Sequence, residues 1–382
     1  MFDWNRARRQ RLPTLVVPRL LPLMAPHRAE YRVHDDSNEL QAAPPLVVRW
    51  PAEVRRPHIG LVQDVDLYPY WTKYRRFLET NHFPFRLIDI HSRSWIDMVA
   101  GLDMIVWRPT WTPSGLDEAR RKIFFLNEFL GIKTYPTLRS VNLYEDKILQ
   151  SWAFATLGLD TPPTVTSFSR PDALEGVKGL GEEVVWKITD GSASFGVELL
   201  SPRRARAAVR RAFSARGRRT YWPYRNQKDY VYAQALQRDL RTDMRVIVVG
   251  PLLFGWYRDT PPGDFRASGM GRERMEALPS DALEEAWRIS REIAVGAVAV
   301  DFIVDHECRQ RKVIELCSFT GVHTQAQLQV DGRSGVYLRR APGDFEFREG
   351  RYWVQELALA EALGSACGLD TDRVLLDSIL IG

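Results

Sequence analysis

A lysine stands inside an apolar run in the stretch VVWKITDGSASFGVELL, residues 184–200. Its neighbours, residues 184–186 and Ile188, have the character of a buried strand. Burying an ammonium group costs several kcal/mol unless it has a partner, so a core strand gives no reason for Lys187. A strand that delivers a cation to an anionic ligand, followed by a loop of small residues, does give one.

Two carboxylates form a second anomaly, in GAVAVDFIVDHECRQRKVIELCSF, residues 296–319. Two apolar strands flank a polar turn, and they hold Asp301 and Glu315. If the turn centres on Cys308, the two acids lie directly opposite each other. Facing like charges are destabilising and buried carboxylates are costly, but a Mg²⁺ ion held with substrate phosphates removes both problems. The alternative is that one acid pairs with an arginine and the other lies at a strand end.

Arginines and aspartates gather in a third cluster, between residues 243 and 268. Arg245 and Arg258 bracket an apolar hairpin around Gly250–Pro251, and guanidinium groups at the ends of buried strands can clamp phosphate or carboxylate oxygens bidentately. The segment GDFRAS adds Arg266. The alternative is ordinary ion pairing with three neighbouring acids: Asp243, Asp259 and Asp264.

Several motifs with known chemistry are missing. The sequence has no G-x-x-x-x-G-K-S/T phosphate loop, no G-x-G-x-x-G after a strand and no nucleophile elbow. HECRQ has Gln310 where a zincin helix needs its second histidine. The three cysteines include no C-x-x-C pair, so they favour neither a disulfide framework nor a zinc site, and a reducing cytoplasmic location fits best.

Composition is that of a soluble globular protein with two or three domains, at 382 residues, 45% hydrophobic and 26% charged. The net charge of +5 favours anionic ligands only weakly. An arginine-rich helix and its continuation, residues 203–219, form either a solvated face or a contact for an acidic partner. Because no aromatic residues interleave with these arginines, nucleic-acid binding is not supported. No apolar run is long enough to cross a bilayer.

The elements that must position these residues follow from periodicity. Residues 1–55 are rich in Pro and Arg and are expected to form an irregular arm. Strands alternate with helices over residues 56–140, which predicts a small parallel α/β domain. Beyond it we expect helices at 144–158, 203–213 and 282–296, strands around the three clusters, a strand-like segment at 352–364 and a terminal helix.

In this order the elements resemble the ATP-grasp superfamily, most closely the RimK-type and glutathione-synthetase-like ligases, over residues 141–325. The resemblance implies an α/β protein (α+β lobes) with the ATP-grasp fold and an N-terminal parallel α/β pre-ATP-grasp domain. Its divisions would be an arm (1–55), the pre-ATP-grasp domain (56–140), a small lobe with the phosphate loop (141–236) and a large lobe with the metal strands and C-terminal helix (237–382).

The resemblance also assigns roles to residues. YEDK places Lys147 where the family has a lysine on the nucleotide phosphates, and VVWKITDGSASFGV looks like the strand lysine and flexible loop. YAQAL is similar to the hinge between the lobes that contacts adenine. The implied nucleotide-binding residues are Lys147, Lys187, Gly191, Ser192, Gly196, Gln234, Ala235, Leu236, Asp243 and Ser268. Arg245, Arg258 and Arg266 would stabilise the reacting phosphoryl group.

Asp301 and Glu315 would be the metal ligands. Cys317 stands where the family usually has an asparagine ligand, and a thiol is a poor ligand for Mg²⁺. The implied cofactors are ATP and Mg²⁺, with Mn²⁺ as a substitute.

The implied activity is ATP-dependent joining of a small-molecule or peptide carboxylate to an amine through an acylphosphate, with release of ADP and phosphate. A nucleotide-binding pseudoenzyme, which Cys317 favours, and a phosphotransferase stay open as alternatives. Association into a homo-oligomer is compatible with the sequence. In the N-terminal region, Asp64, Asp66 and Lys73 either face a substrate or only support packing by the aromatic residues around them.

Overall fold

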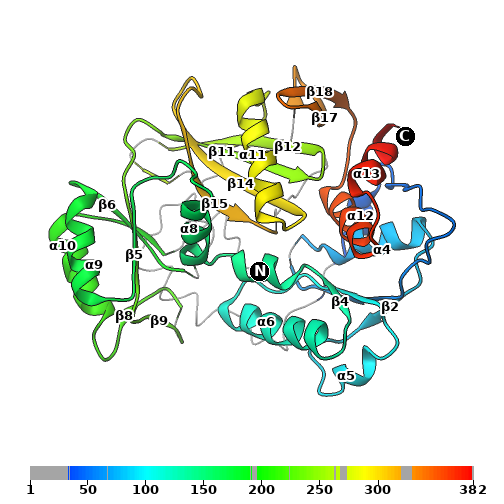
Figure 1. The fold of residues 1–382 in the computed structure, drawn as a ribbon, viewed down its shortest axis with the longest axis horizontal. Helices are drawn as coiled ribbons and strands as arrows, with labels where there is room; N and C mark the ends of the chain where they lie inside the picture. The colour runs from blue at the N-terminus through cyan, green and yellow to red at the C-terminus, as the bar shows by residue number, and fades with distance from the viewer. Residues whose placement is uncertain are drawn as a thin grey trace.

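Three β-sheets organise the described part of the computed structural model, which comprises residues 33, 35–66, 68–189, 191, 196–222, 224–261, 264–266, 273–319 and 329–380 (Figure 1). A short two-stranded ribbon, β8 (Arg218–Arg219) with β9 (Asn226–Gln227), lies outside these three sheets. The mixture of one parallel and two antiparallel sheets is the α/β class expected from the sequence.

The N-terminal sheet is parallel, with strand order β2-β1-β3-β4. Its strands are β1 (Ile59–Val62), β2 (Phe85–Ile88), β3 (Met104–Val106) and β4 (Lys133–Tyr135), and the helices between them are α4 (Trp71–Thr80), α5 (Trp95–Met98) and α6 (Pro113–Glu128). The chain runs from β1 outward to β2 and then returns to place β3 on the other side of β1. In such sheets the crevice at the carboxyl ends of the two strands that flank this reversal is the usual ligand site. Here those strands are β1 and β3.

The small sheet is antiparallel, with strand order β5-β10-β6-β7. Its strands are β5 (Thr164–Ser167), β6 (Val184–Lys187), β7 (Val197–Leu200) and β10 (Val231–Ala235). Two helices, α9 (Arg170–Gly176) and α10 (Pro202–Ala212), and the 3₁₀ turn η2 (Val177–Leu180) cover one face, on the left of Figure 1. Buried alanine and valine side chains let these helices approach the sheet closely. The opposite face remains available for the site.

The large sheet has eight antiparallel strands, with the order β15-β14-β11-β12-β17-β16 and with β13 and β18 at its side. Their bounds are β11 (Thr242–Val249), β12 (Leu252–Asp259), β13 (Glu273–Arg274), β14 (Ala297–Val304), β15 (Arg311–Cys317), β16 (Gln329–Val330), β17 (Arg333–Ala341) and β18 (Asp344–Glu349). Helix α11 (Ser280–Ile293) packs on this sheet through its apolar stripe, and α7 (Leu138–Leu143) and α8 (Lys147–Thr156) link the N-terminal sheet to the small sheet. The two predicted acids and the arginines Arg245 and Arg258 thus lie on this sheet, whereas Lys187 lies on β6 of the small sheet.

A β-bulge sets the register between β14 and β15. Phe302 is opposite Val313, but the next pair is Asp301 with Glu315, so Ile314 is the extra residue. The prediction that the two acids face each other is confirmed, but its premise is wrong, because the strand pairs next to the turn centre it between Glu307 and Cys308. Without the bulge Asp301 would face Ile314, and Glu315 would lie on the other face of the strand.

The C-terminal region departs from the sequence prediction. Residues predicted as strand-like, 352–364, belong mostly to the helix α12 (Val354–Ala366), and the chain ends in the expected helix, here α13 (Thr371–Leu380). Helix α12 is buried around most of its circumference, so its apolar residues show no helical stripe, and periodicity alone cannot separate such a helix from a buried strand. Its leucine, alanine and glutamate content favours the helix. The β17–β18 hairpin was not predicted.

The described part of the N-terminal arm packs on α4 and α12 after one short helical turn, α3 (Ser37–Leu40). The backbone N–H of Leu46 donates to Glu356 of α12 at 3.1 Å, and Glu356 also pairs with Arg76 of α4 at 2.6 Å. The N–H of Val48 donates to the Asn81 side chain at 2.8 Å. Across these described ranges, no helix has the length and apolar character needed to cross a membrane.

Candidate active site

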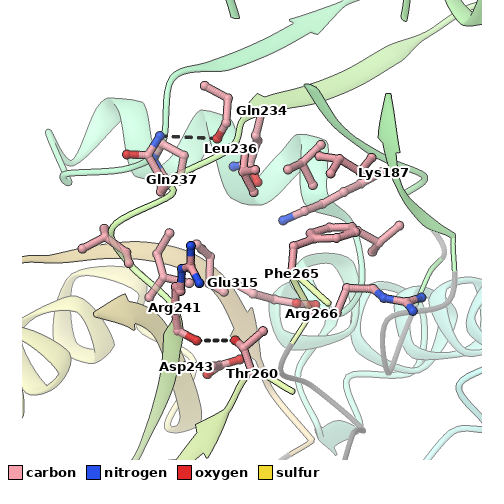
Figure 2. A pocket seen from close by; sticks show the side chains of 18 of the residues that line it. Lys187, Gln234, Leu236, Gln237, Arg241, Asp243, Thr260, Phe265, Arg266 and Glu315 are labelled. Carbon is pink, nitrogen blue, oxygen red and sulfur yellow. Dashed lines mark hydrogen bonds between the residues drawn. The ribbon is translucent and has the colours of Figure 1, made fainter. Parts of the chain in front are cut away.

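A cavity of about 410 Å³ lies between the small sheet and the large sheet (Figure 2). Apolar side chains from both sheets wall it, with Val185 and Leu199 on one side and Ile303 and Ile314 on the other. Cations and carboxylates converge at one part of it. A narrow apolar slot next to a charged region can hold a flat aromatic base together with a polyanionic tail.

Most of the residues predicted from the sequence line this one cavity: Lys147, Lys187, Gly191, Gln234, Ala235, Leu236, Asp243, Arg266, Asp301 and Glu315. Four others do not line it: Gly196, Arg245, Arg258 and Cys317. Ser192 and Ser268 lie outside the described residues. Thus five segments that are distant in the sequence, at residues 147, 187–191, 234–243, 266 and 301–315, meet at one place.

Lys187 ends β6 and its ammonium group points into the cavity (Figure 2). Within the part of the chain that the structure describes, no carboxylate lies within ion-pair distance of it. Burial lowers the pKa of Lys187 to about 8, with Glu315 opposing the shift. A bound polyanion would reverse this shift, because a neighbouring negative charge favours the protonated amine.

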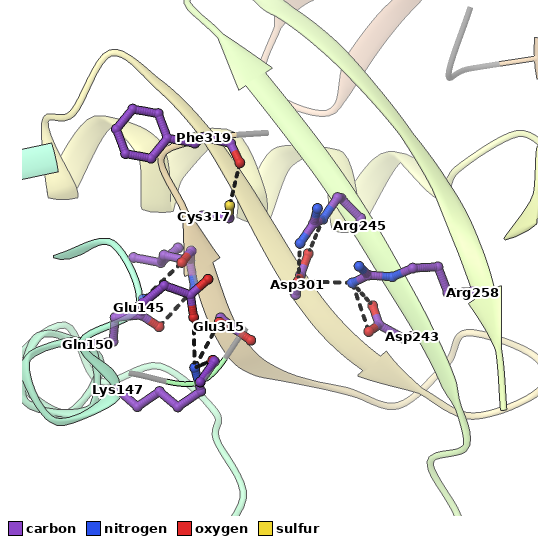
Figure 3. A network of polar contacts seen from close by, with 12 residues as sticks. Glu145, Lys147, Gln150, Asp243, Arg245, Arg258, Asp301, Glu315, Cys317 and Phe319 are labelled. Carbon is purple, nitrogen blue, oxygen red and sulfur yellow. Dashed lines mark hydrogen bonds and ion pairs between the residues drawn. The ribbon is translucent and has the colours of Figure 1, made fainter. Parts of the chain in front are cut away.

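Lys147, at the start of α8, is buried and already has partners (Figure 3). Its ammonium group donates to Glu315 at 3.1 Å, to Glu145 at 3.3 Å and to the carbonyl oxygen of Gly191 at 2.8 Å. Burial raises the pKa of Glu145 to about 7, and Lys147 opposes that shift. Lys147 therefore ties the loop that follows β6 to the strand that carries Glu315.

Asp301 lies between two guanidinium groups (Figure 3). Arg245 donates to both its oxygens at 2.7 Å, and Arg258 approaches the second oxygen at 2.9 Å while donating to Asp243 at 2.6 and 2.8 Å. Although burial opposes ionisation, the two arginines hold the pKa of Asp301 below its usual range. Arg245 and Arg258 thus lie behind the cavity wall and fix Asp301, whereas the resemblance had suggested that they contact the ligand directly.

Cys317 is held as a thiol. Its sulfur donates to the carbonyl oxygen of Phe319 at 2.7 Å, and burial raises its pKa to about 12. A neutral thiol that is already hydrogen-bonded is neither a nucleophile nor a ligand for a hard cation.

The fit of a divalent cation follows from the donors that face the cavity. Among the described residues no group of three or more His, Cys, Asp or Glu side chains could hold a metal. Glu315 and Asp301 still present hard oxygens to one cavity, and each ionised carboxylate has about four lone-pair sites, of which Glu315 uses one and Asp301 three. Two carboxylates fit Mg²⁺ if phosphate oxygens and water supply the remaining ligands.

The end of β10 and the rim complete the cavity. At the end of β10 the backbone N–H of Ala235 donates to the Pro163 carbonyl oxygen at 2.9 Å, and the Gln234 amide donates to Thr164 at 3.1 Å. Arg266 is at the rim, where it pairs with Asp264 at 2.8 Å.

Two of the three N-terminal residues proposed as a substrate wall, Asp64 and Lys73, have structural roles. Lys73 is buried, pairs with Asp36 and lies over the ring of Trp353, so it cannot face a substrate and that option is wrong. Asp64 caps α4 by accepting the N–H groups of Tyr70 and Trp71 at 2.9 and 2.8 Å. Lys73 and Asp64 therefore agree with the alternative interpretation, in which these residues support the local structure.

Two buried charged residues were missed by the sequence interpretation. Glu145 has a positive φ of 61° and contacts Lys147; its only sequence signal was an acid two positions before that lysine in YEDK. Arg108 follows β3 and has no sequence signal, because its neighbours come from three separate segments.

The arginine-rich helix lies within one residue of the bounds expected from the sequence, 203–213, and its continuation is not helical. Helix α10 ends at Ala212, and Arg218, in β8, pairs with Glu198. The arginines of the helix itself are exposed: Arg203, Arg204, Arg206, Arg210 and Arg211. An acidic partner on this surface stays a prediction.

Comparison with solved structures identifies the architecture. A crystal structure of D-alanine–D-alanine ligase from Bacillus anthracis in complex with ATP superposes with a TM-score of 0.52, at 15% sequence identity, over 85% of this chain and 96% of that one. The chain has the ATP-grasp fold.

Other ATP-grasp structures superpose with lower scores. A RimK-domain ATP-grasp protein from Sphaerobacter thermophilus gives a TM-score of 0.46 at 15% identity, over 85% of this chain and 99% of that one. A RiPP-associated ATP-grasp ligase from Chryseobacterium gregarium, in complex with ADP and a leader and core peptide, gives a TM-score of 0.48 at 13% identity, over 69% of this chain and 89% of that one. No protein-family model and no curated protein matches the sequence.

Proposed function

We propose that this protein is an ATP-dependent ligase that joins a carboxylate to an amine. The observation that carries the proposal is the meeting of Lys147 and Lys187 with Asp301 and Glu315 in one cavity between two sheets. Cations and acids arranged in this way suit a nucleoside triphosphate with its metal ion, and the apolar slot beside them suits the base.

In the first step a substrate carboxylate oxygen attacks the γ-phosphorus of ATP, the bond from the γ-phosphorus to the bridging oxygen breaks, and ADP leaves. Lys187 supplies positive charge at the phosphates, and Arg266 is placed on the rim to contact the transferring group. Arg245 and Arg258 act one layer behind, where they hold Asp301 ionised and fixed. Positioning and electrostatic stabilisation carry the rate of such a transfer.

A metal ion, Mg²⁺ or Mn²⁺, would be held by Glu315 with help from Asp301, and it would neutralise charge on the phosphate oxygens. Lys147 hydrogen-bonds to Glu315 and to the Gly191 carbonyl oxygen, so it positions both the acid and the loop.

In the second step the amine nitrogen attacks the acyl carbon of the acylphosphate, phosphate leaves with the bonding electrons, and the amine loses a proton to solvent or to a base. The product is an amide. The proposal includes three further points. The enzyme is of the RimK and glutathione-synthetase type, its two lobes comprise residues 141–236 and 237–382, and it acts in the cytoplasm.

The test is a phosphate-release screen with ATP and Mg²⁺ over pooled carboxylates and amines. The ligase releases phosphate only when both a carboxylate and an amine are present, and Lys187→Met abolishes the release whereas the exposed Lys178→Met does not. A phosphorylated product that accumulates without amine would instead identify a phosphotransferase. Nucleotide-dependent thermal stabilisation without turnover in any pool would identify a binding protein.

A further inference from the structure

Arg108 lies at the reversal point of the N-terminal sheet. It follows β3, and Asp66, which follows β1, lies closest to it among the described carboxylates, with 3.8 Å between the Arg108 Nη2 and an Asp66 oxygen. This is the crevice at the carboxyl ends of two parallel strands where α/β sheets usually bind ligands.

The Arg108 guanidinium is buried but poorly paired. Only 7% of the residue is exposed, and its one hydrogen bond in the described structure runs from Nη1 to the carbonyl oxygen of Pro109. Its Nε has no partner among the described residues, and the contact to Asp66 exceeds hydrogen-bond distance. Asp64 and Asp66 favour the charged guanidinium through electrostatic attraction, but the Asp64 carboxylate accepts its hydrogen bonds from the start of α4 and not from Arg108. Burying a guanidinium group whose N–H donors lack acceptors costs free energy, and a bound anion that accepts hydrogen bonds from these donors would offset that cost.

Three aromatic rings surround the guanidinium. Its carbon lies 4.1 Å from the ring centroid of Phe319, 5.1 Å from that of Tyr70 and 5.6 Å from that of Tyr144. These rings hold the planar group in place and leave the edge formed by Nε and Nη2 as the unsatisfied one. That edge carries two parallel N–H donors, which match the two oxygens of a carboxylate.

The same rings connect Arg108 to the cavity. Phe319 follows β15, four residues after Glu315, and four extended residues span at most about 13 Å. Tyr144 directly precedes Glu145, which contacts Lys147. Arg108 therefore packs against the ends of two segments that also supply residues to the cavity, Glu315 and Lys147.

We propose that Arg108 binds a second, non-reacting carboxylate of the substrate, so that the amine component is an amino acid or a peptide end with a free carboxylate. This inference rests on the proposed ligase function and names its substrate class. Arg108 determines specificity and takes no part in bond formation.

The experiment compares the twenty amino acids with their carboxamides in two assays. One assay measures phosphate release with ATP, Mg²⁺ and pooled carboxylates; the other measures the thermal unfolding midpoint with Mg-ADP, which needs no turnover. The variants are Arg108→Met, which keeps volume, and Arg108→Lys, which keeps charge. Arg339→Met is the matched control, because Arg339 also lies over an aromatic ring, Trp287, and pairs with Glu284 away from the cavity.

We expect at least one amino acid to stabilise the wild type and to release phosphate about tenfold better than its amide. Arg108→Met should raise KM by about tenfold or more with little change in kcat and should erase the preference for the free acid, while Arg108→Lys restores part of it. Equal effects of acids and amides, no binding of any acid, or an unchanged preference in Arg108→Met would overturn the inference. Arg108-dependent stabilisation by an acid without phosphate release in any pool would instead overturn the ligase function and leave the carboxylate site standing.

Discussion

Two residues are most informative about the site. One is a lysine without an ion-pair partner among the described residues, and the other is an aspartate that pairs with two arginines. Lys187 has a depressed pKa and faces the cavity, whereas Asp301 is held by Arg245 and Arg258. Lys187 can therefore pair with a bound anion, whereas Asp301 is fixed in the wall of the cavity by its two arginines. Each leads to a separate prediction.

Lys187→Met should stabilise the free protein at pH 7 by about 1–3 kcal/mol, because the native state no longer holds a partly buried charge without a described partner. Burial lowers the pKa of Lys187 to about 8 from an ordinary value of 10.5. Below pH 8 native and unfolded chains are both protonated and the full cost is present. Between pH 8 and 10.5 the unfolded chain binds more protons, so the wild type gains stability as the pH rises and the advantage of the variant disappears.

Urea unfolding of the wild type and Lys187→Met at pH 7 and pH 10 measures this difference. Lys178→Met, at an exposed lysine, should stay within about 0.5 kcal/mol at both pH values. A Lys187→Met protein that is less stable than the wild type at pH 7 would show that the buried ammonium has a partner of its own.

Asp301→Asn should lower the free energy of unfolding by about 3–5 kcal/mol, because it leaves two buried guanidinium groups without their shared carboxylate. Asp259→Asn, in an exposed pair with Arg274, is the control and should cost less than about 1 kcal/mol. Denaturant titration of both variants and the wild type measures these two losses in the free energy of unfolding. Equal losses would mean that the Asp301 pairs are as solvated as those at the surface.

Among the secondary-structure elements, alternation of strands and helices and the helical stripes predicted most of the fold before residue 300. Helix α12 was assigned wrongly because a helix buried on all sides has no amphipathic period. The bulge at Ile314 left no sequence signal either. It depends on Val313 and Leu316 both facing the core, which the pattern VIEL does not specify.

The residues of the candidate site likewise include some that the sequence predicts and some that it does not. Lys187, Asp301 and Glu315 were predictable because each is a charge inside an apolar strand. Arg108 was not, because its burial comes from Tyr70, Tyr144 and Phe319, which only the tertiary structure brings together.

Helix α12 anchors the arm through Glu356, and this element can be tested by itself. Glu356→Ala removes the carboxylate that pairs with Arg76 and accepts from the Leu46 N–H, while two backbone carbonyl oxygens still accept from Arg76, so we expect a loss of about 3 kcal/mol in unfolding free energy. Amide hydrogen exchange at Leu46 should also accelerate. Glu346→Ala, which removes the exposed partner of Arg340, should do neither. Unchanged exchange at Leu46 in Glu356→Ala would show that apolar packing alone holds the arm.

For the whole molecule, the cavity depends on two sheets that approach each other from distant parts of the chain. One wall comes from β6 and β7 and the other from β14 and β15, and Lys147 connects them through Gly191 and Glu315. A ligand that binds only when both walls are in place stabilises the folded protein by mass action, by about 2.7 kcal/mol at a concentration of 100 Kd. Nucleotide binding is therefore the property on which the ligase proposal depends.

Calorimetric titration with a non-hydrolysable ATP analogue and Mg²⁺ tests that property most directly. We predict one binding site in the wild type, an affinity about 10–100-fold lower in Lys187→Met because a charge-assisted hydrogen bond is lost, and an unchanged affinity in Lys178→Met. Equal affinity of Lys187→Met and the wild type, or no binding by the wild type, would contradict the account.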